Sequence, residues 1–321
     1  MSLRVPFGWL LTAAAMPRKR RAAKGWTMSH GPADGRGTLE AGLYLVSVPI
    51  GNARDITLRA LDVLGAAEVL AAEDTRSLRR LMEIHGVARA GRQILSYHDR
   101  SRSADRARLL GLLGEGRSVA YASEAGTPCV SDPGYALVAE AAAVGHAVRA
   151  VPGPSAFVAA LTVAGLPTDR FLFAGFPPPA RGARLTWMDG LGGAGATVAI
   201  YESPRRVHRT LGELSDRLGD RAAALCRELT KLHEEVIRGT LSEIAAAVEG
   251  REIKGEVVIL LDRGPPRAAE VGDVRAALEA ALREMTVKDA ARAVSEETGM
   301  ARREVYAMAL AMKDGGRGAD G

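Results

Sequence analysis

Cysteine is scarce in this sequence, and long apolar segments are absent from it. The 321 residues include two cysteines, Cys129 and Cys226. This number argues against a disulfide framework and is typical of a reducing compartment, so we expect a cytoplasmic location. No apolar stretch approaches the roughly 20 residues of a membrane-spanning helix, so we expect no membrane association. The six histidines are scattered and lack the Cys/His spacing of zinc sites, so we expect no metal.

The composition is that of a globular protein with an excess of positive charge. Hydrophobic residues make up 47% of the chain and charged residues 25%, which is ordinary for a folded domain. The length suggests two domains, because domains usually hold roughly 100–200 residues. The formal net charge of +5 favours a polyanionic partner such as nucleic acid. A solvated basic surface is an equally good interpretation of the charge alone.

Residues 1–41 form an extension that we predict to be disordered. The apolar run 5–15 could pass for a signal-peptide core, but the basic cluster follows it at 18–21, which is the wrong polarity. Gly, Ser and Pro then dominate up to residue 42, as in disordered segments. Two alternatives stay open: Met28 is the true initiator, or the extension is a basic arm that contacts RNA.

Residues 42–152 are predicted to form an α/β domain with a mostly parallel sheet. Short apolar runs alternate there with helical patterns, as in βαβ units. Asp55 is expected to cap the first helix, whose apolar face would hold Leu58, Leu61 and Leu64. The expected strands are 43–48, 69–72, 94–97, 118–122 and 148–151.

Residues 153–263 are predicted to form a second, mixed α+β domain after a Pro-Gly-Pro hinge at 152–154. Fewer helices separate its strands, so we expect antiparallel pairs. Residues 264–321 are predicted to form a small helical region in which 287–306 has a helix-turn-helix outline. That region either binds nucleic acid or packs as an appendage. The strands expected in the second domain are 171–173, 197–201, 222–226, 234–238 and 256–261.

Three expected strands end in small or polar residues. These tips are 49–52, 73–76 and 123–134, the last of which contains Ala-Gly-Thr-Pro. Small, turn-forming residues let the backbone contact a ligand, and open α/β sheets bind ligands beyond the carboxyl ends of their strands. The three tips therefore predict one crevice, and we interpret the chain as an enzyme. Taken alone, Ala-Gly-Thr-Pro is better explained as a tight turn that binds nothing, and its place beside two comparable tips favours a ligand site.

Seven motifs occur in order along the chain and point to one family. They are Leu-Val-Ser-Val-Pro-Ile-Gly-Asn at 45–52, Ala-Glu-Asp-Thr-Arg at 72–76, the segment 123–134, Pro-Gly-Pro-Ser at 152–155, Tyr-Glu-Ser-Pro-Arg-Arg at 201–206, Arg-Glu-Leu-Thr-Lys at 227–231 and Lys-Gly-Glu at 254–256. Together they closely resemble the tetrapyrrole methylase family over residues 43–261. The turn 49–52 favours the branch of that family that acts on RNA, and the helical tail is similar to the tail found in that branch.

The resemblance implies a tetrapyrrole-methylase-like homodimer of two-domain chains, with S-adenosylmethionine bound in a cleft between the domains. It also implies 2′-O-methylation of a ribose in 16S rRNA, at cytidine 1402, with the small ribosomal subunit as partner. Two other functions stay open. One is methylation of a tetrapyrrole carbon, and the other is non-catalytic RNA binding by a ribosome-assembly factor. Binding of S-adenosylmethionine would separate either enzyme from the binding protein.

The resemblance also gives ten candidate cofactor-binding residues. S-adenosylmethionine carries a sulfonium, a zwitterionic tail and an adenine, so its site needs exposed backbone, small residues and apolar walls. Glu124 stands where most relatives have Asp, which keeps the charge but adds a methylene. The segment 152–155, which holds two of the ten residues, is equally consistent with a hinge, and Phe176 with a core residue. The candidates are Pro49, Gly51, Ser123, Ala125, Gly126, Thr127, Pro128, Pro152, Ser155 and Phe176.

Two residues are candidates for a catalytic base. Methyl transfer is an in-line displacement, so alignment of the acceptor oxygen, the methyl carbon and the sulfur can supply most of the acceleration. A ribose hydroxyl is a weak nucleophile, so a nearby base should help. Asp74 at the second tip is the first candidate and His98 the second. Asp74 is equally consistent with a helix cap or an ion pair with Arg76. His98 is better explained as a surface or hydrogen-bonded histidine than as a base.

Two clusters of arginines are candidates for RNA binding. One cluster follows the acidic tip Glu73-Asp74 and the other follows Ser203-Pro204. Guanidinium groups bind phosphates and stack on unpaired bases. A solvated helix face is the alternative interpretation of each arginine taken singly. The candidates are Arg76, Arg79, Arg80, Arg205, Arg206 and Arg209.

Overall fold

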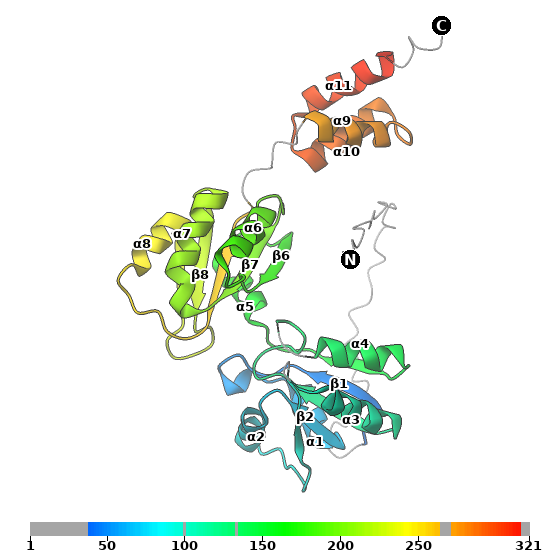
Figure 1. Ribbon diagram of the computed structural model, residues 1–321, viewed down its shortest axis with the longest axis vertical. Helices are drawn as coiled ribbons and strands as arrows, with labels where there is room; N and C mark the ends of the chain where they lie inside the picture. Colours follow the sequence, from blue (N-terminus) through cyan, green and yellow to red (C-terminus); the bar gives the residue numbers. More distant parts are fainter. Residues whose placement is uncertain (1–37, 99–100, 132–133, 264–270, 316–321) are drawn as a thin grey trace.

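The computed structural model of the chain describes residues 38–98, 101–131, 134–263 and 271–315. Most of the predicted N-terminal extension, residues 1–37, lies outside the described residues. Two sheets with their helices and a separate group of three helices follow one another along the molecule (Figure 1). Within the described ranges, no helix is long and apolar enough to cross a membrane.

The first sheet has five parallel strands in the order β3-β2-β4-β1-β5. Strands β2 and β4 are buried along their whole length, as expected for a parallel sheet covered on both faces. Helices α1 and α2 pack on one face, and α3 and α4 on the other. The predicted parallel α/β arrangement is confirmed. The elements are β1 (Gly42–Val46), α1 (Leu58–Ala66), β2 (Val69–Ala72), α2 (Thr75–Ile84), β3 (Ile94–Ser96), α3 (Ser103–Gly114), β4 (Ser118–Ala122), α4 (Tyr135–Ala143) and β5 (Val148–Val151).

The start of α1 differs from the prediction. Thr57, not Asp55, is the N-cap, and its side chain accepts a hydrogen bond of 3.1 Å from the N–H of Ala60. Asp55 instead lies in the short 3-10 helix Ala53–Asp55. The predicted apolar face is also wrong in part, because Leu58 at the first helical position is 81% exposed. Either polar residue can cap a helix, and the extra 3-10 turn shifts the start to Thr57.

The second sheet has the order β6-β7-β10-β8-β9. Strands β6 and β7 are parallel and the remaining pairs are antiparallel, so the predicted mixed sheet is confirmed. Helix α5 covers one face, and α6, α7 and α8 cover the other. The elements are α5 (Ala156–Ala164), β6 (Phe171–Gly175), α6 (Arg181–Leu191), β7 (Thr197–Glu202), the 3-10 helix η2 (Pro204–Arg206), α7 (Val207–Leu218), β8 (Ala222–Arg227), β9 (Glu235–Thr240), α8 (Leu241–Val248) and β10 (Val257–Leu261).

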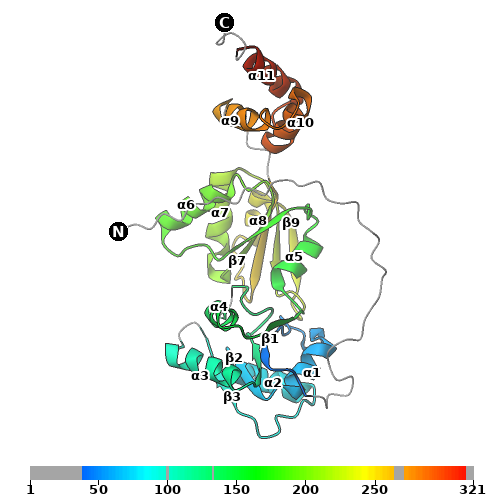
Figure 2. The same cartoon turned by 90° about the vertical axis from the view of Figure 1, so that its right-hand side faces the viewer.

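The three C-terminal helices form a core of their own. They are α9 (Val271–Ala281), α10 (Val287–Thr298) and α11 (Arg302–Gly315). Val274, Leu278, Val294 and Val305 are buried between them. In both views the three helices lie at the end of the molecule opposite the first sheet (Figure 2). The predicted helical region is therefore present as a small unit beyond the second sheet.

A buried ion pair joins α6 to α7. The Arg184 side chain is 2% exposed, and its guanidinium donates to both carboxylate oxygens of Glu213 at 2.6 and 2.8 Å. Its Nη1 also donates to the carbonyl of Pro179 at 2.8 Å. A second pair, Arg217 with Asp189, joins the same two helices at the surface. Two arginine–carboxylate ion pairs thus join the same two helices, one of them buried and the other exposed to solvent.

Removing the two arginines should therefore have very different effects. Arg184→Ala leaves the Glu213 carboxylate without its cation in a largely buried position, so we expect it to lower the free energy of unfolding by about 3–5 kcal/mol. Arg217→Ala is the matched control and should cost about 1 kcal/mol or less, because its pair is solvated. Urea denaturation of the three proteins measures both effects. Equal losses in the two variants would contradict this account.

Candidate functional site

Two hollows adjoin at the carboxyl edge of the first sheet. The first, the interdomain cavity, has a volume of about 320 Å³ and is lined by both domains. The second, the groove, has a volume of about 790 Å³ and is lined mainly by the first domain. Three residues line both hollows: Ile50, Ala125 and Glu256. A molecule held in the cavity and one held in the groove would therefore meet at these three residues.

Hydrogen bonds tie three of the strand ends together. Val48 and Gly126 exchange two backbone hydrogen bonds of 2.9 and 3.1 Å, which join the loops after β1 and β4. The hydroxyl of Ser47 donates to Thr127 Oγ1 at 3.1 Å. The hydroxyl of Thr127 in turn donates to the carbonyl of Pro154, after β5, at 2.9 Å. Three parallel strands thus end in one continuous wall of the interdomain cavity.

Gly126 meets a conformational requirement in this wall. Its φ is +74°, a region that side chains with a Cβ rarely adopt. A Cβ built there would also lie 3.4 Å from the Ile50 side chain. The buried hydroxyl of Ser123 donates to the carbonyl oxygens of Ala125 and Gly126, at 3.2 and 3.1 Å. Glycine and serine therefore fix the turn that exposes the backbone to the cavity.

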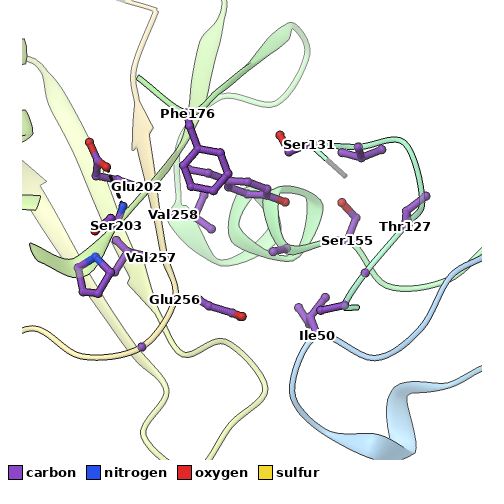
Figure 3. Close-up of a pocket in the computed structure, with 17 residues that line it drawn as sticks. Ile50, Thr127, Ser131, Ser155, Phe176, Glu202, Ser203, Glu256, Val257 and Val258 are labelled. Atoms are coloured by element: carbon purple, nitrogen blue, oxygen red, sulfur yellow. Dashed lines mark hydrogen bonds between the residues drawn. The ribbon is translucent and has the colours of Figure 1, made fainter. Parts of the chain in front are cut away.

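The second domain supplies the opposite wall (Figure 3). Phe176, directly after β6, is 53% exposed and packs edge-on against Tyr201 of β7, with ring centroids 5.5 Å apart. Val257 and Val258 at the start of β10 add aliphatic surface. This wall offers an aromatic face and apolar groups to a flat, partly apolar ligand.

Glu202 lines the cavity, but its carboxylate is fully engaged by protein groups. Its oxygens accept hydrogen bonds from the Ser203 N–H at 2.7 Å and the Thr210 hydroxyl at 2.6 Å. The Arg206 guanidinium lies 2.7 Å from Oε1. The side chain is buried, so these contacts anchor the turn from β7 into η2 beside the cavity.

The loops after β1 and β8 meet at the mouth of the cavity. The N–H of Asn52 donates to Thr230 Oγ1 at 3.1 Å. Lys231 Nζ lies 2.8 Å from Glu228 Oε1 and 3.2 Å from Glu256 Oε2. Burial alone would lower the pKa of Lys231, but the bonds and charges of the two carboxylates raise it above its ordinary value. Lys231 therefore stays a cation at the junction of the two domains.

The structure brings eight of the ten candidate cofactor residues to the two hollows. Pro128 and Pro152 line neither of them. Three of the eight lie in the groove only: Pro49, Gly51 and Ser123. The other five line the interdomain cavity: Ala125, Gly126, Thr127, Ser155 and Phe176. The assignment of these residues to a cofactor stays a prediction.

The two candidate bases lie in different surroundings. Asp74 lines the groove and is also the N-cap of α2, as the alternative interpretation had it. Its Oδ1 accepts from the N–H of Arg76 at 2.7 Å, and its Oδ2 from the Arg76 guanidinium at 3.1 Å. These bonds hold the pKa of Asp74 below its ordinary value. His98 lines neither hollow, and its backbone N–H donates to Ser101 Oγ at 2.8 Å.

The two clusters of candidate RNA-binding arginines differ in whether they line the groove. Arg76 and Arg80 line the groove, and Arg79 is exposed on the same helix, α2. Arg205 and Arg209 are exposed but line neither hollow, and Arg206 pairs with Glu202. The cluster on α2 is therefore the one that faces the groove.

Several residues of the second wall were not singled out from the sequence. Tyr201, Glu202 and Ser203 belong to one motif of the family resemblance, and Gly255 and Glu256 to another, but no role was assigned to these five residues. No sequence pattern shows that these residues lie together, because only the pairing of the strands brings them to the site. In the antiparallel register Val257 pairs with Glu202, which places the end of β7 beside the start of β10 at the cavity. Within the described ranges, no three His, Cys, Asp or Glu side chains are grouped to hold a metal ion.

Comparison with known proteins gives two family matches. The model described as Tetrapyrrole (Corrin/Porphyrin) Methylases matches residues 42–245, and the one described as RsmI C-terminal HTH domain matches residues 268–313. Three relatives named ribosomal RNA small subunit methyltransferase I are similar over most of their length. That of Mesorhizobium japonicum is 44% identical, covering 88% of this chain and 96% of the relative. Those of Micromonospora olivasterospora and Thermotoga maritima are 41% and 39% identical, covering 82% and 68% of this chain and 85% and 97% of the relatives.

Solved structures share the fold at lower identity. A diphthine synthase has a TM-score of 0.55 and 18% identity, covering 68% of this chain and 89% of the other. The methyltransferase CobJ has a TM-score of 0.55 and 19% identity, covering 71% and 96%. At this identity the likeness shows the fold alone.

The contact between the two domains predicts the effect of filling Gly51. A Cβ there would overlap Lys231 Cγ and lie 2.8 Å from Thr230 Oγ1. We therefore expect Gly51→Ala to lower the free energy of unfolding by about 1–3 kcal/mol, as overpacking does. Gly111→Ala is the matched control, because Gly111 is exposed within α3 and has nothing within 4 Å of an added Cβ. It should stabilise the protein by about 1 kcal/mol in the same chemical denaturation. A stabilised Gly51→Ala protein would show that the two loops do not touch as described.

Proposed function

Because this chain belongs to the tetrapyrrole methylase family and, within it, to the group of ribosomal RNA small subunit methyltransferase I, we propose that it 2′-O-methylates cytidine 1402 of 16S rRNA. It is an S-adenosylmethionine-dependent methyltransferase that acts on ribosomal RNA. The observation that supports methyl transfer to an RNA strand is the junction of the two hollows, and cytidine 1402 is proposed from the family resemblance. A cavity suited to the methyl donor opens directly into a groove flanked by arginines.

The residues of the interdomain cavity fit S-adenosylmethionine. The half-exposed ring of Phe176, backed by Tyr201, offers a flat face to an adenine. The turn at Gly126 exposes backbone groups, and Ser155 adds a hydroxyl. The volume of about 320 Å³ lies within the range of small-molecule pockets, roughly 300–1,000 Å³. Ten earlier candidates reduce to five that we propose for direct contact: Ala125, Gly126, Thr127, Ser155 and Phe176.

The groove supports a polyanionic acceptor. Arg76 and Arg80 line it, and Arg79 lies beside them on α2. Guanidinium groups pair with phosphates and stack on unpaired bases, which is how proteins recognise single-stranded RNA. The match of the C-terminal helices to an HTH family favours a nucleic-acid role for them over simple packing. A homodimer remains an expectation from the family resemblance.

Residues of the cavity and the groove would align the methyl donor with the acceptor. When bound, S-adenosylmethionine supplies a methyl group on a positively charged sulfur. The turn at Gly126 and the ring of Phe176 hold the two ends of a ligand in the cavity, and Ile50 and the two valines exclude water from its interior. The arginines of α2 hold the acceptor strand in the groove. Orientation of this kind can supply a large part of the rate acceleration.

Methylation of small ribosomal subunits tests the proposal. The purified protein is incubated with radiolabelled S-adenosylmethionine and with subunits from cells that lack the enzyme, and the modified nucleotide is then mapped. We expect label on the ribose of cytidine 1402. Label on a base, on another nucleotide, on protein or on a pigment, with this ribose unmodified, would end the proposal.

The aromatic wall predicts a specific loss of cofactor affinity. Phe176→Ala removes the ring proposed to face the adenine, and stacking of a base on an aromatic ring contributes about 1–3 kcal/mol. We therefore expect the affinity for S-adenosylmethionine, measured by calorimetry, to fall by roughly 5- to 150-fold. Phe171→Ala is the control, because Phe171 is similarly exposed on β6 but does not line the cavity. Equal affinities in the two variants would remove Phe176 from the site.

A further inference from the structure

We propose that Glu256 is the carboxylate that receives the acceptor hydroxyl at the junction of the interdomain cavity and the groove, and that Lys231 positions it. This inference rests on the proposed function and assigns the proton acceptor of that reaction. Neither residue was among the two bases suggested by the sequence.

Glu256 is the polar side chain at the junction. Of the three residues that line both hollows, Ile50 and Ala125 have apolar side chains and only Glu256 can accept a hydrogen bond through its side chain. In the close-up, the Glu256 carboxylate points from the start of β10 across the opening toward Ile50 (Figure 3). A hydroxyl that enters from the groove to reach a methyl group in the cavity must pass this carboxylate.

The backbone around Glu256 is fixed by its neighbours. Gly255 has a φ of +85°, and a Cβ built on it would overlap the Glu228 side chain. The N–H of Glu256 donates to Glu228 Oε1 at 3.0 Å. Lys231 holds the other end, with Nζ 3.2 Å from Glu256 Oε2. One contact therefore holds the backbone of Glu256 and another holds its carboxylate before any ligand binds.

One oxygen of Glu256 remains for a ligand. Among the described residues Oε1 has no hydrogen-bond partner, and the side chain is 66% exposed. Two other carboxylates of the hollows, Glu202 and Asp74, differ in this respect. Both oxygens of Glu202 and both oxygens of Asp74 accept hydrogen bonds from protein groups. Glu256 thus combines a fixed position with an unused acceptor.

The proposed step is an in-line transfer of a methyl group from sulfur to oxygen, with loss of the hydroxyl proton. The acceptor oxygen forms a bond to the methyl carbon while the carbon–sulfur bond breaks. The electron pair of the carbon–sulfur bond goes to the sulfur, which becomes neutral. The oxygen becomes strongly acidic as it gains the methyl group, and its proton passes to Glu256 Oε1. A carboxylate is a weak base toward a free ribose hydroxyl, so its main earlier effect is to direct an oxygen lone pair at the methyl group.

Single-turnover methylation of small subunits, at saturating S-adenosylmethionine, tests the role of Glu256. We expect Glu256→Gln to slow the reaction by about 100-fold or more, the usual effect of a lost acid–base group. Its affinity for S-adenosylmethionine should stay within about twofold of that of the unmodified protein. Glu256→Asp, which keeps the charge on a shorter arm, should recover part of the rate. Glu252→Gln is the matched control, because Glu252 is an exposed carboxylate of the same loop, paired with Lys254, that lines neither hollow.

The role of Lys231 is tested by combining variants. If Lys231 acts through Glu256, Lys231→Met should slow turnover by roughly 10-fold, and adding it to Glu256→Gln should cause little further loss. A purely structural lysine would give additive losses instead. Thermal unfolding of each variant shows that the fold is retained.

Three results would overturn the inference. They are a Glu256→Gln protein that turns over at the rate of the control, a rate loss matched by an equal loss of cofactor affinity, or a larger loss in Asp74→Asn than in Glu256→Gln. The second result would make Glu256 a cofactor-binding residue. Failure of the unmodified protein to methylate the subunits would instead count against the proposed function, so the two failures are distinguishable.

Discussion

The insertion of the loop after β1 into the second domain is the contact on which the rest of the site depends. Ile50 is buried in the apolar cluster under α5, Gly51 packs against Lys231, and the N–H of Asn52 is bonded to Thr230. The same loop is tied to the loop after β4 through Val48 and Gly126. One short segment therefore connects the strand ends of the first sheet to the second domain, and residues of both domains line the cavity.

The first wall could be predicted from the sequence because its signals are local. Parallel strands end at one edge of a sheet, so small and polar residues after successive strands identify that edge without further information. The tips after β1, β2 and β4 do line the two hollows. Local signals did not decide the start of α1, because two nearby residues could each cap the helix. Asp55 and Thr57 are both good caps, and only the 3-10 turn before α1 decides for Thr57.

The second wall could not be predicted in the same way because it depends on strand pairing. Glu202 and Val257 are neighbours through the antiparallel register of β7 and β10, and no local pattern gives that register. Helix α6 was missed for a related reason. Its buried face includes Arg184, which pairs with Glu213 on α7. A buried arginine does not fit the apolar pattern of a helix face, and its partner is known only from the structure. Residues that meet only through tertiary contacts cannot be assigned to a site from local sequence patterns.

The account is tested most directly by a crystal structure of the protein with S-adenosylhomocysteine bound. It predicts the adenine against Phe176 and the sulfur directed at the opening formed by Ile50, Ala125 and Glu256, with the groove left for the acceptor. A complex in which the ligand occupies the groove, or another surface, while the interdomain cavity stays empty would contradict it.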